Sequence, residues 1–393
     1  MLKRLLIVAI LSIATYSLSA QQYEEVIVDS DTLRYRYTPT DQTSKNTIST
    51  FGQRLYNYTT LEEGERINFS VTGTPAYSAN LGWSLMAIGD IQYRTRNISL
   101  PQSLQICATA SLTGYYGLDI DGINIFSRGK HRLSYSLKAH STPTKIYGLD
   151  FATSAQNSCG SYTNNMYVAS ICYTTLLSQR YLLGAHLDYR YEKADKLDSY
   201  ASTIIGDRNK RYYGGGVGAT FGIRNSRTEG INLKRGIDIT IDTTFRPHFI
   251  SNNDSDILQI NLLFDYYQPL WKNALLAIDI YGEYNTKNTP WMLRAELGDN
   301  YRMRGYYPGR YNGNTLITGQ LELRQLIWQS LVIAAWGGVG SVFSPEDNFD
   351  TSKILPNYGA GIRWHLNTDT AIRFDVGFGR GCYNFILGLN EAF

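Results

Sequence analysis

The sequence lacks a hydrophobic run long enough to cross a membrane as a helix, once its first twenty residues are set aside. A membrane helix needs about eighteen or more consecutive apolar residues, and the nearest approach in this 393-residue chain is the segment 326–343. Gln329 and Ser330 interrupt that segment, and each of its glycines costs a helix roughly 1 kcal/mol relative to alanine. We therefore interpret the segment as two strands joined at these two residues.

Cysteine is scarce, with four residues in the chain, Cys107, Cys159, Cys172 and Cys382. Their spacings match no metal-binding motif, so we predict no metal site and no cofactor. An exported protein can form disulfide bonds. The sequence leaves open whether these thiols are paired, and free or buried thiols are the simpler interpretation.

The sequence motifs of common enzymes are missing as well. There is no G-x-S-x-G, no H-E-x-x-H and no G-x-x-x-x-G-K-[ST]. We therefore predict that the chain is not an enzyme. His186 shares one face of a predicted strand with Asp188, and Ser178 lies close to it in the sequence. This triplet leaves an outer-membrane hydrolase as an alternative.

The chain begins with the features of an export signal. Lys3 and Arg4 precede an apolar run, 5–14, and small residues lead to Ala20. This order is typical of a cleaved secretory signal peptide, which we place at 1–20. No cysteine follows the expected cleavage point, which argues against a lipoprotein. Residues 21–64 are polar and are predicted to form a short periplasmic extension.

The composition of the remainder is that of a β-protein with many aromatic side chains. The chain contains 31 Tyr, 6 Trp and 35 Gly, and its formal net charge is only +3. A charge this small predicts no nucleic-acid partner. In transmembrane β-barrels aromatic girdles mark both membrane interfaces, and this composition fits that class. A large secreted β-sandwich shares much of it, so the alternation of residues has to decide.

From residue 65 to residue 393 the chain alternates apolar and polar residues with a period of two. Leu187, Ile239 and Leu262 each belong to an apolar face, whereas His186 and Asn261 belong to the opposite, polar faces. Such alternation is typical of strands that turn one face to lipid and the other to a hydrated lumen. Because the polar faces carry opposite charges in many strands, we predict an all-β fold, a 16-stranded antiparallel transmembrane β-barrel over 65–393.

The strand order provides an internal check on this prediction. We predict strands at 66–73, 80–93, 103–112, 115–126, 130–140, 162–175, 179–193, 209–224, 234–245, 254–269, 272–285, 314–328, 330–344, 356–367, 369–380 and 382–392. The count is even, as in single-chain bacterial barrels. The long connections 141–161, 194–208, 286–313 and 345–355 all follow odd-numbered strands, which predicts that they lie together on the outer side.

One loop carries a motif. Met303-Arg304-Gly305-Tyr306 lies in the long connection after the eleventh predicted strand. It resembles the hydrophobic-Arg-Gly-aromatic motif in the sixth outer loop of the BamA/TamA-like outer-membrane assembly barrels, also called bacterial surface antigens. The segments 321–324, 336–340, 358–364, 373–377 and 385–393 are similar to the strands that follow in that family. The repeated periplasmic domains usual in the family have no counterpart in 21–64, so the chain resembles its barrel-only members.

The resemblance implies an inward loop held by a buried ion pair. Arg304 is expected to pair with Glu322, since an arginine can bind a wall carboxylate through two hydrogen bonds. The family's second carboxylate, on the thirteenth strand, is Gly338 here. Asp279 and Asp375 are the candidate replacements. Phe393 is expected to act as the C-terminal assembly signal.

The function implied by the resemblance is assistance with the insertion or translocation of proteins, or of lipids, at the outer membrane of a diderm bacterium. Outer-membrane lipids and substrate outer-membrane or secreted proteins are the expected partners, and the barrel is expected to be monomeric. A passive pore or structural barrel is the alternative, and the hydrolase is the second.

Overall fold

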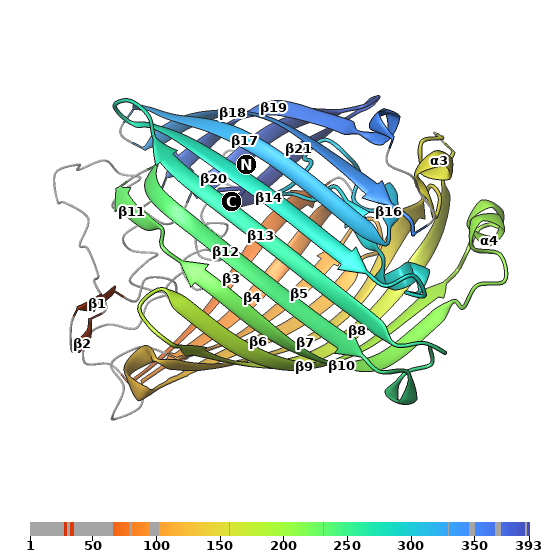
Figure 1. Ribbon diagram of the computed structural model, residues 1–393, viewed down its shortest axis with the longest axis horizontal. Coiled ribbons are helices and arrows are strands. Elements are labelled where there is room, and N and C mark those ends of the chain that lie inside the picture. The colour runs from red at the N-terminus through yellow and green to blue at the C-terminus, as the bar shows by residue number, and fades with distance from the viewer. Residues whose placement is uncertain are drawn as a thin grey trace.

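The chain forms an antiparallel β-barrel of tilted strands (Figure 1). The computed structural model describes residues 27–29, 32–34, 66–78, 81–94, 102–156, 158–230, 232–328, 330–345, 350–365, 371–389 and 391–393. The predicted signal peptide lies outside the described residues. Of the predicted extension, 21–64, only a short hairpin is described, β1 (Ile27–Asp29) with β2 (Thr32–Arg34).

Sixteen long strands make up the barrel among the described residues, as predicted. Its first half comprises β3 (Ile67–Ser78), β4 (Gly82–Tyr93), β5 (Gln102–Ser111), β6 (Tyr116–Phe126), β7 (His131–Ile146), β8 (Gly160–Leu176), β9 (Tyr181–Asp195) and β10 (Arg211–Arg224). Its second half comprises β12 (Leu233–Arg246), β13 (Ile257–Pro269), β14 (Ala274–Asn285), β17 (Thr315–Trp328), β18 (Leu331–Phe343), β19 (Leu355–His365), β20 (Ala371–Gly379) and β21 (Cys382–Leu389). Strand β21 is the neighbour of β3 in the strand order.

The period-two pattern determines which side chains enter the lumen. Leu187 and Leu262 are 56% and 41% exposed on the outer face, although both are large and apolar. Their sequence neighbours His186 and Asn261 lie on the opposite face. His186 Nε2 is 3.0 Å from Thr244 Oγ1. An apolar outside and a charged, hydrogen-bonded inside suit a barrel in lipid and not a soluble sandwich.

Tryptophan and tyrosine side chains lie on the outer surface near both ends of the barrel. Trp271, Trp328 and Trp364 are exposed near one end, at the turns that follow β13, β17 and β19. Trp83 and Tyr116 are exposed near the other end, where β4 and β6 begin. The two groups form the girdles that the composition predicted, because aromatic rings favour the interface between lipid and water.

The long connections gather at one end of the barrel, which we call the loop end (Figure 1). They contain α3 (Phe151–Ser154), α4 (Ser199–Ile205), η2 (His248–Ile250), η3 (Trp291–Leu293), η4 (Thr351–Lys353) and a hairpin of β15 (Ala295–Leu297) with β16 (Tyr311–Gly313). The opposite end, the turn end, holds the shorter connections, with η1 (Ser127–Gly129) and β11 (Arg227–Gly230), which pairs with β12. This separation follows the predicted alternation of long and short connections.

Several strand boundaries differ from the prediction. Strand β3 runs to Ser78, whereas a strand over 66–73 was predicted. Strands β7 and β8 pair from His131 with Thr175 to Ile146 with Gly160, so the predicted loop 141–161 is shorter than expected. Strand β21 ends at Leu389, whereas a strand to 392 was predicted. Beyond the strand, the Glu391 carboxylate lies against arginines inside the barrel.

The expected membrane span and the state of the thiols can also be compared with the structure. No helix among the described residues is long and apolar enough to span a membrane. The segment 326–343 is divided between β17 and β18, as expected. All four cysteines are free thiols, and Cys107 is buried in the barrel wall.

The two faces of β13 should respond differently to charge. Leu262→Arg places a guanidinium in hydrocarbon and should destabilise the folded barrel by about 2–4 kcal/mol if the site is near the midplane. Asn261→Arg is the matched control, because Asn261 pairs across the sheet with Asp242 and is opposite Glu283, so the new charge meets carboxylates. Unfolding in lipid vesicles with denaturant measures both. Equal losses would contradict the assignment of faces.

Candidate functional site

The candidate site is the long connection between β14 and β17, which turns into the barrel. Its tip carries two tight backbone bends, at Met303 with φ of 49° and at Gly305 with φ of 133°. Gly305 needs its lack of a side chain, because a Cβ there would lie 2.8 Å from the backbone of Phe378. Met303, Arg304 and Tyr306 are each 0% exposed. The four motif residues predicted from the sequence therefore lie together inside the barrel.

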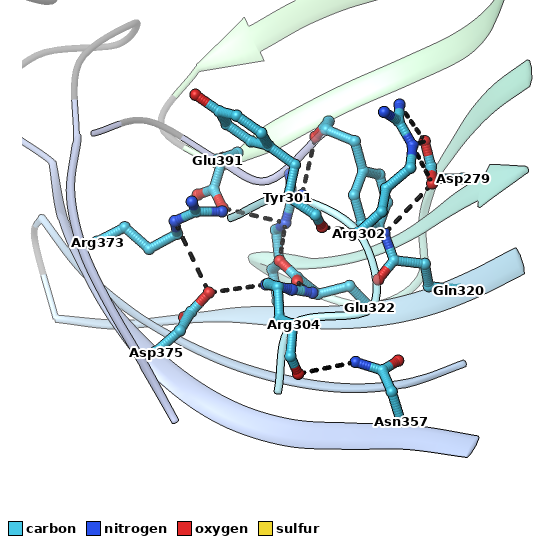
Figure 2. Close-up of polar contacts among 12 residues, drawn as sticks. Asp279, Tyr301, Arg302, Arg304, Gln320, Glu322, Asn357, Arg373, Asp375 and Glu391 are labelled. Atoms are coloured by element: carbon cyan, nitrogen blue, oxygen red, sulfur yellow. Dashed lines mark hydrogen bonds and ion pairs between the residues drawn. The ribbon is translucent and has the colours of Figure 1, made fainter. Parts of the chain in front are cut away.

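Arg304 lies between two carboxylates on different strands (Figure 2). Its Nη2 donates to Glu322 Oε2 on β17 at 2.5 Å, and its Nη1 donates to Asp375 Oδ2 on β20 at 2.8 Å. The guanidinium also stacks 3.7 Å from the centre of the Trp336 ring on β18. All three ionic side chains are fully buried. The carboxylates of Glu322 and Asp375 and the face of the Trp336 ring therefore all contact the guanidinium of Arg304, which lies on the loop.

A second arginine on the same loop makes a separate anchor. Arg302 binds Asp279 on β14 through Nε, at 2.9 and 3.0 Å, and through Nη2, at 2.8 Å (Figure 2). Its guanidinium also lies 4.7 Å from the centre of the Tyr281 ring. Burial lowers the pKa of Arg302, but the carboxylates of Asp279, Asp299 and Asp265 together raise it above its ordinary value. Arg302 thus stays charged, and Asp279 serves Arg302 and not Arg304.

Position 338, where the resemblance led us to expect a carboxylate, is Gly338, and Arg304 receives its second carboxylate from β20. A Cβ on Gly338 would lie 2.7 Å from the carbonyl oxygen of Gly319 and 2.9 Å from Asn357 Oδ1. A carboxylate at 338 would therefore require these neighbours to move. Of the two replacements expected from the sequence, Asp375 is the one that contacts Arg304.

Glycines on β20 let the loop tip approach the wall closely. A Cβ on Gly377 would lie 2.0 Å from the carbonyl oxygen of Arg304, and one on Gly379 would lie 2.6 Å from the Tyr306 ring. On β19, Asn357 Nδ2 donates to the same Arg304 carbonyl at 3.0 Å (Figure 2). Backbone contacts of this kind fix where the guanidinium can reach.

Tyr306 completes the docking of the tip. Its hydroxyl donates to the carbonyl of Pro356 at 2.7 Å and accepts from the backbone N–H of Arg380 at 2.8 Å. Burial raises the pKa of Tyr306 to about 12, so the hydroxyl keeps its proton at neutral pH. The ring packs in an apolar cluster with Met303, Leu297 and neighbours from the wall.

The ion pairs extend beyond the loop toward the turn end. Glu322 Oε1 accepts from Arg324 Nε at 2.7 Å and from Arg363 Nη2 at 3.1 Å. Arg363 also donates to Asp375 Oδ1 at 2.5 Å. Glu391, which follows β21, lies 3.0 Å from Arg363 Nε and 3.3 Å from Arg324 Nε. We call Arg304, Glu322, Arg324, Arg363, Arg373, Asp375 and Glu391 the lumen ion network.

Phe393 lies at the turn end of this network. Its ring packs against Tyr267, Leu275 and Ala277, which are buried lumen residues of β13 and β14. Phe393 therefore lies inside the barrel, whereas continuing the alternation of the last strand would place it on the lipid face. The role of Phe393 in assembly stays a prediction.

The residues of the hydrolase alternative do not come together. Ser178 lies in the turn before β9, and its hydroxyl accepts from Arg180 N–H at 3.4 Å. His186 is five residues beyond the start of β9, about 16 Å along the strand. Asp188 is paired with Arg246 at 2.5 Å. Among the described residues no group of three or more His, Cys, Asp or Glu is arranged to hold a metal ion.

Several residues of the site were not identified from the sequence. Arg302 stands one residue before the motif, and Arg363, Arg373 and Gly377 fall within segments noted only for their likeness to closing strands. A usable signal was present, because each charged residue falls on the polar face of an alternating strand or in the loop. Which charges meet depends on the tilt and closure of the barrel, and alternation alone does not specify these.

Solved structures with a similar fold include three outer-membrane proteins. BamA from Haemophilus ducreyi lacking POTRA domains 1–3 has 13% identity and a TM-score of 0.59, over 83% of this chain and 71% of that chain. CdiB from Acinetobacter baumannii has 14% identity and a TM-score of 0.54, over 83% and 60%. CdiB from Escherichia coli has 12% identity and a TM-score of 0.57, over 84% and 64%.

The chain spans less than two thirds of each CdiB chain. No protein-family model and no curated protein matches the sequence. The likeness shows the fold, a BamA-like β-barrel.

The ion pair of Arg304 with Glu322 should behave as one unit. Arg304→Ala and Glu322→Ala should each speed protease cutting within 286–313, and Glu322→Ala should have the larger effect because two further arginines lose a partner. Breaking a fully buried pair costs about 3–5 kcal/mol. The double variant should resemble Glu322→Ala alone, since partners in one network are non-additive.

Arg302→Ala is the control for this cycle. Its carboxylate, Asp279, is not shared with Arg304, so its effect should add to that of Arg304→Ala. Simple additivity between Arg304→Ala and Glu322→Ala would show that the two side chains act separately.

Proposed function

We propose that this BamA-like barrel assists the insertion or translocation of proteins, or of lipids, at the outer membrane. The proposal rests on the buried loop tip. Arg304 attaches the tip to carboxylates on β17 and β20, and Arg302 attaches it to a carboxylate on β14. A loop anchored inside the lumen narrows it, which favours this proposal over an open passive pore. The likeness to BamA and CdiB folds supports the same class of function.

The seam between β21 and β3 is the proposed site of lateral opening. Among neighbouring long strands of the described barrel, these two make the least extensive contact. Strand β21 is also the shortest of the sixteen, with 8 residues. A short pairing has few ladder hydrogen bonds to break, so the barrel should open there before it opens elsewhere. Substrate outer-membrane or secreted proteins, and the surrounding lipids, are the proposed partners of the opened edge.

The loop end should face the cell exterior and the turn end the periplasm. Ser202→Cys, on α4, and Lys272→Cys, in the turn after β13, are exposed positions at opposite ends. On a background without the four native cysteines, a membrane-impermeant thiol reagent applied to whole cells should label Cys at 202 only. Permeabilised cells should label both. Labelling of position 272 on intact cells would reverse the orientation.

Depletion tests the function itself. If the proposal holds, loss of the protein should lower the amounts of a subset of outer-membrane proteins or lipids, and expression of the wild-type chain should restore them. Arg304→Ala, produced at equal levels, should restore them poorly. An unchanged outer-membrane inventory, together with steady ion conductance of the purified barrel in planar bilayers, would favour the passive pore.

A further inference from the structure

The segment that follows β21, residues 391–393, is held inside the barrel by a formed site. Its acidic residue, Glu391, approaches three basic side chains of the wall. Glu391 Oε2 is 3.0 Å from Arg363 Nε and 3.3 Å from Arg324 Nε, and Oε1 is 3.4 Å from His365 Nε2. The two arginines are 0% and 3% exposed. Such buried arginines require an anion, because an unpaired buried charge is strongly destabilising.

The aromatic residue of the same segment occupies an apolar cup. Tyr267, Leu275 and Ala277 form the cup and are each 1% exposed or less. Arg324 Nη2 donates to the main-chain oxygen of Phe393 at 2.9 Å, and its guanidinium lies 5.3 Å from the centre of the Phe393 ring. The site therefore recognises an acidic residue followed, two positions later, by an aromatic ring.

This site shares its charged residues with the loop anchor. Glu322 offers one oxygen to Arg304 and the other to Arg324 and Arg363. Asp375 likewise offers one oxygen to Arg304 and the other to Arg363. The network thus runs without a break from Glu391 at the turn end to Arg304 on the loop.

We propose that residues 391–393 are an internal ligand of the barrel, and that docking of this segment and anchoring of the loop at Arg304 stabilise each other. With Glu391 in place, Arg324 and Arg363 are partly neutralised, so that Glu322 and Asp375 each keep one oxygen at hydrogen-bond distance from Arg304. When it leaves, the same carboxylates face an excess of positive charge, and the hold on Arg304 weakens. This coupling depends on the lumen ion network alone, whatever cargo the barrel handles.

Hydrogen exchange on the purified, folded barrel tests the first half of the coupling. Glu391→Gln should accelerate amide exchange over 299–306 by about tenfold, which corresponds to about 1.4 kcal/mol. Glu391→Asp keeps the charge and should retain most of the protection. Asp242→Asn is the matched control. It removes a lumen carboxylate on β12 that accepts from Thr220 and is not among the partners of the lumen ion network.

A folded barrel is confirmed for each variant by its heat-dependent mobility in gels. Unchanged exchange over 299–306 in Glu391→Gln, or equal acceleration in Asp242→Asn, would overturn the proposal.

Thermodynamic coupling is reciprocal, so the loop should also control the segment. With Ala392→Cys as the sole cysteine, Arg304→Ala should speed thiol labelling at 392, because Ala392 is buried in the wild-type chain. Arg302→Ala loosens the same loop but releases only Asp279, and it should leave the labelling rate unchanged. Equal acceleration by both variants would show general loosening of the loop, and no acceleration by Arg304→Ala would show no coupling. Either result would reject the proposal.

Discussion

The structure depends on how a guanidinium is paired when water is excluded from it. Arg304 is fully buried, so its charge must be met by carboxylates at hydrogen-bond distance. Those carboxylates come from β17 and β20, which are separated by β18 and β19 in the sheet. The loop can therefore dock only on a wall that has already assembled with the correct register across four strands. The two ion pairs of Arg304 therefore require the arrangement that these four strands have in the barrel.

Buried ion pairs are weak evidence for stability, because the cost of desolvation offsets much of the attraction between the charges. Their value here is geometric. An apolar loop tip would slide along an apolar wall, whereas two guanidinium groups bound to Asp279 and to Glu322 with Asp375 allow one placement. The glycine contacts act in the same direction, since Gly377 leaves space for the Arg304 carbonyl and for no side chain. The anchor selects one position of a long loop, and the stability of the barrel rests mainly on its strands.

The sequence predicted the strands well because the membrane enforces a period of two on both faces at once. Leu262 and Asn261 had to face lipid and lumen, respectively, once β13 was recognised. Arg304 and Glu322 were found because a local motif resembled a family. Arg302, Arg363 and Gly377 carry no comparable local pattern. Their roles arise from distant neighbours, the farthest being Arg304 for Gly377, 73 residues away (377 − 304), which only the closed sheet brings together.

The end of β21 shows where local reasoning fails for a physical reason. The sequence around Phe385 continues the alternation, which predicts a strand to 392. In the structure the strand ends at Leu389, and Glu391 pairs with Arg324 and Arg363 inside the barrel. If β21 continued to 392, the alternation would place the Glu391 carboxylate on the lipid-facing side, and the strand ladder would gain only one or two hydrogen bonds. Pairing with Arg324 and Arg363 instead supplies these two buried arginines with an anion, and leaving a buried charge unpaired is strongly destabilising. The charges that hold the loop and those that hold residues 391–393 thus belong to one network, which begins just beyond the strand that neighbours β3.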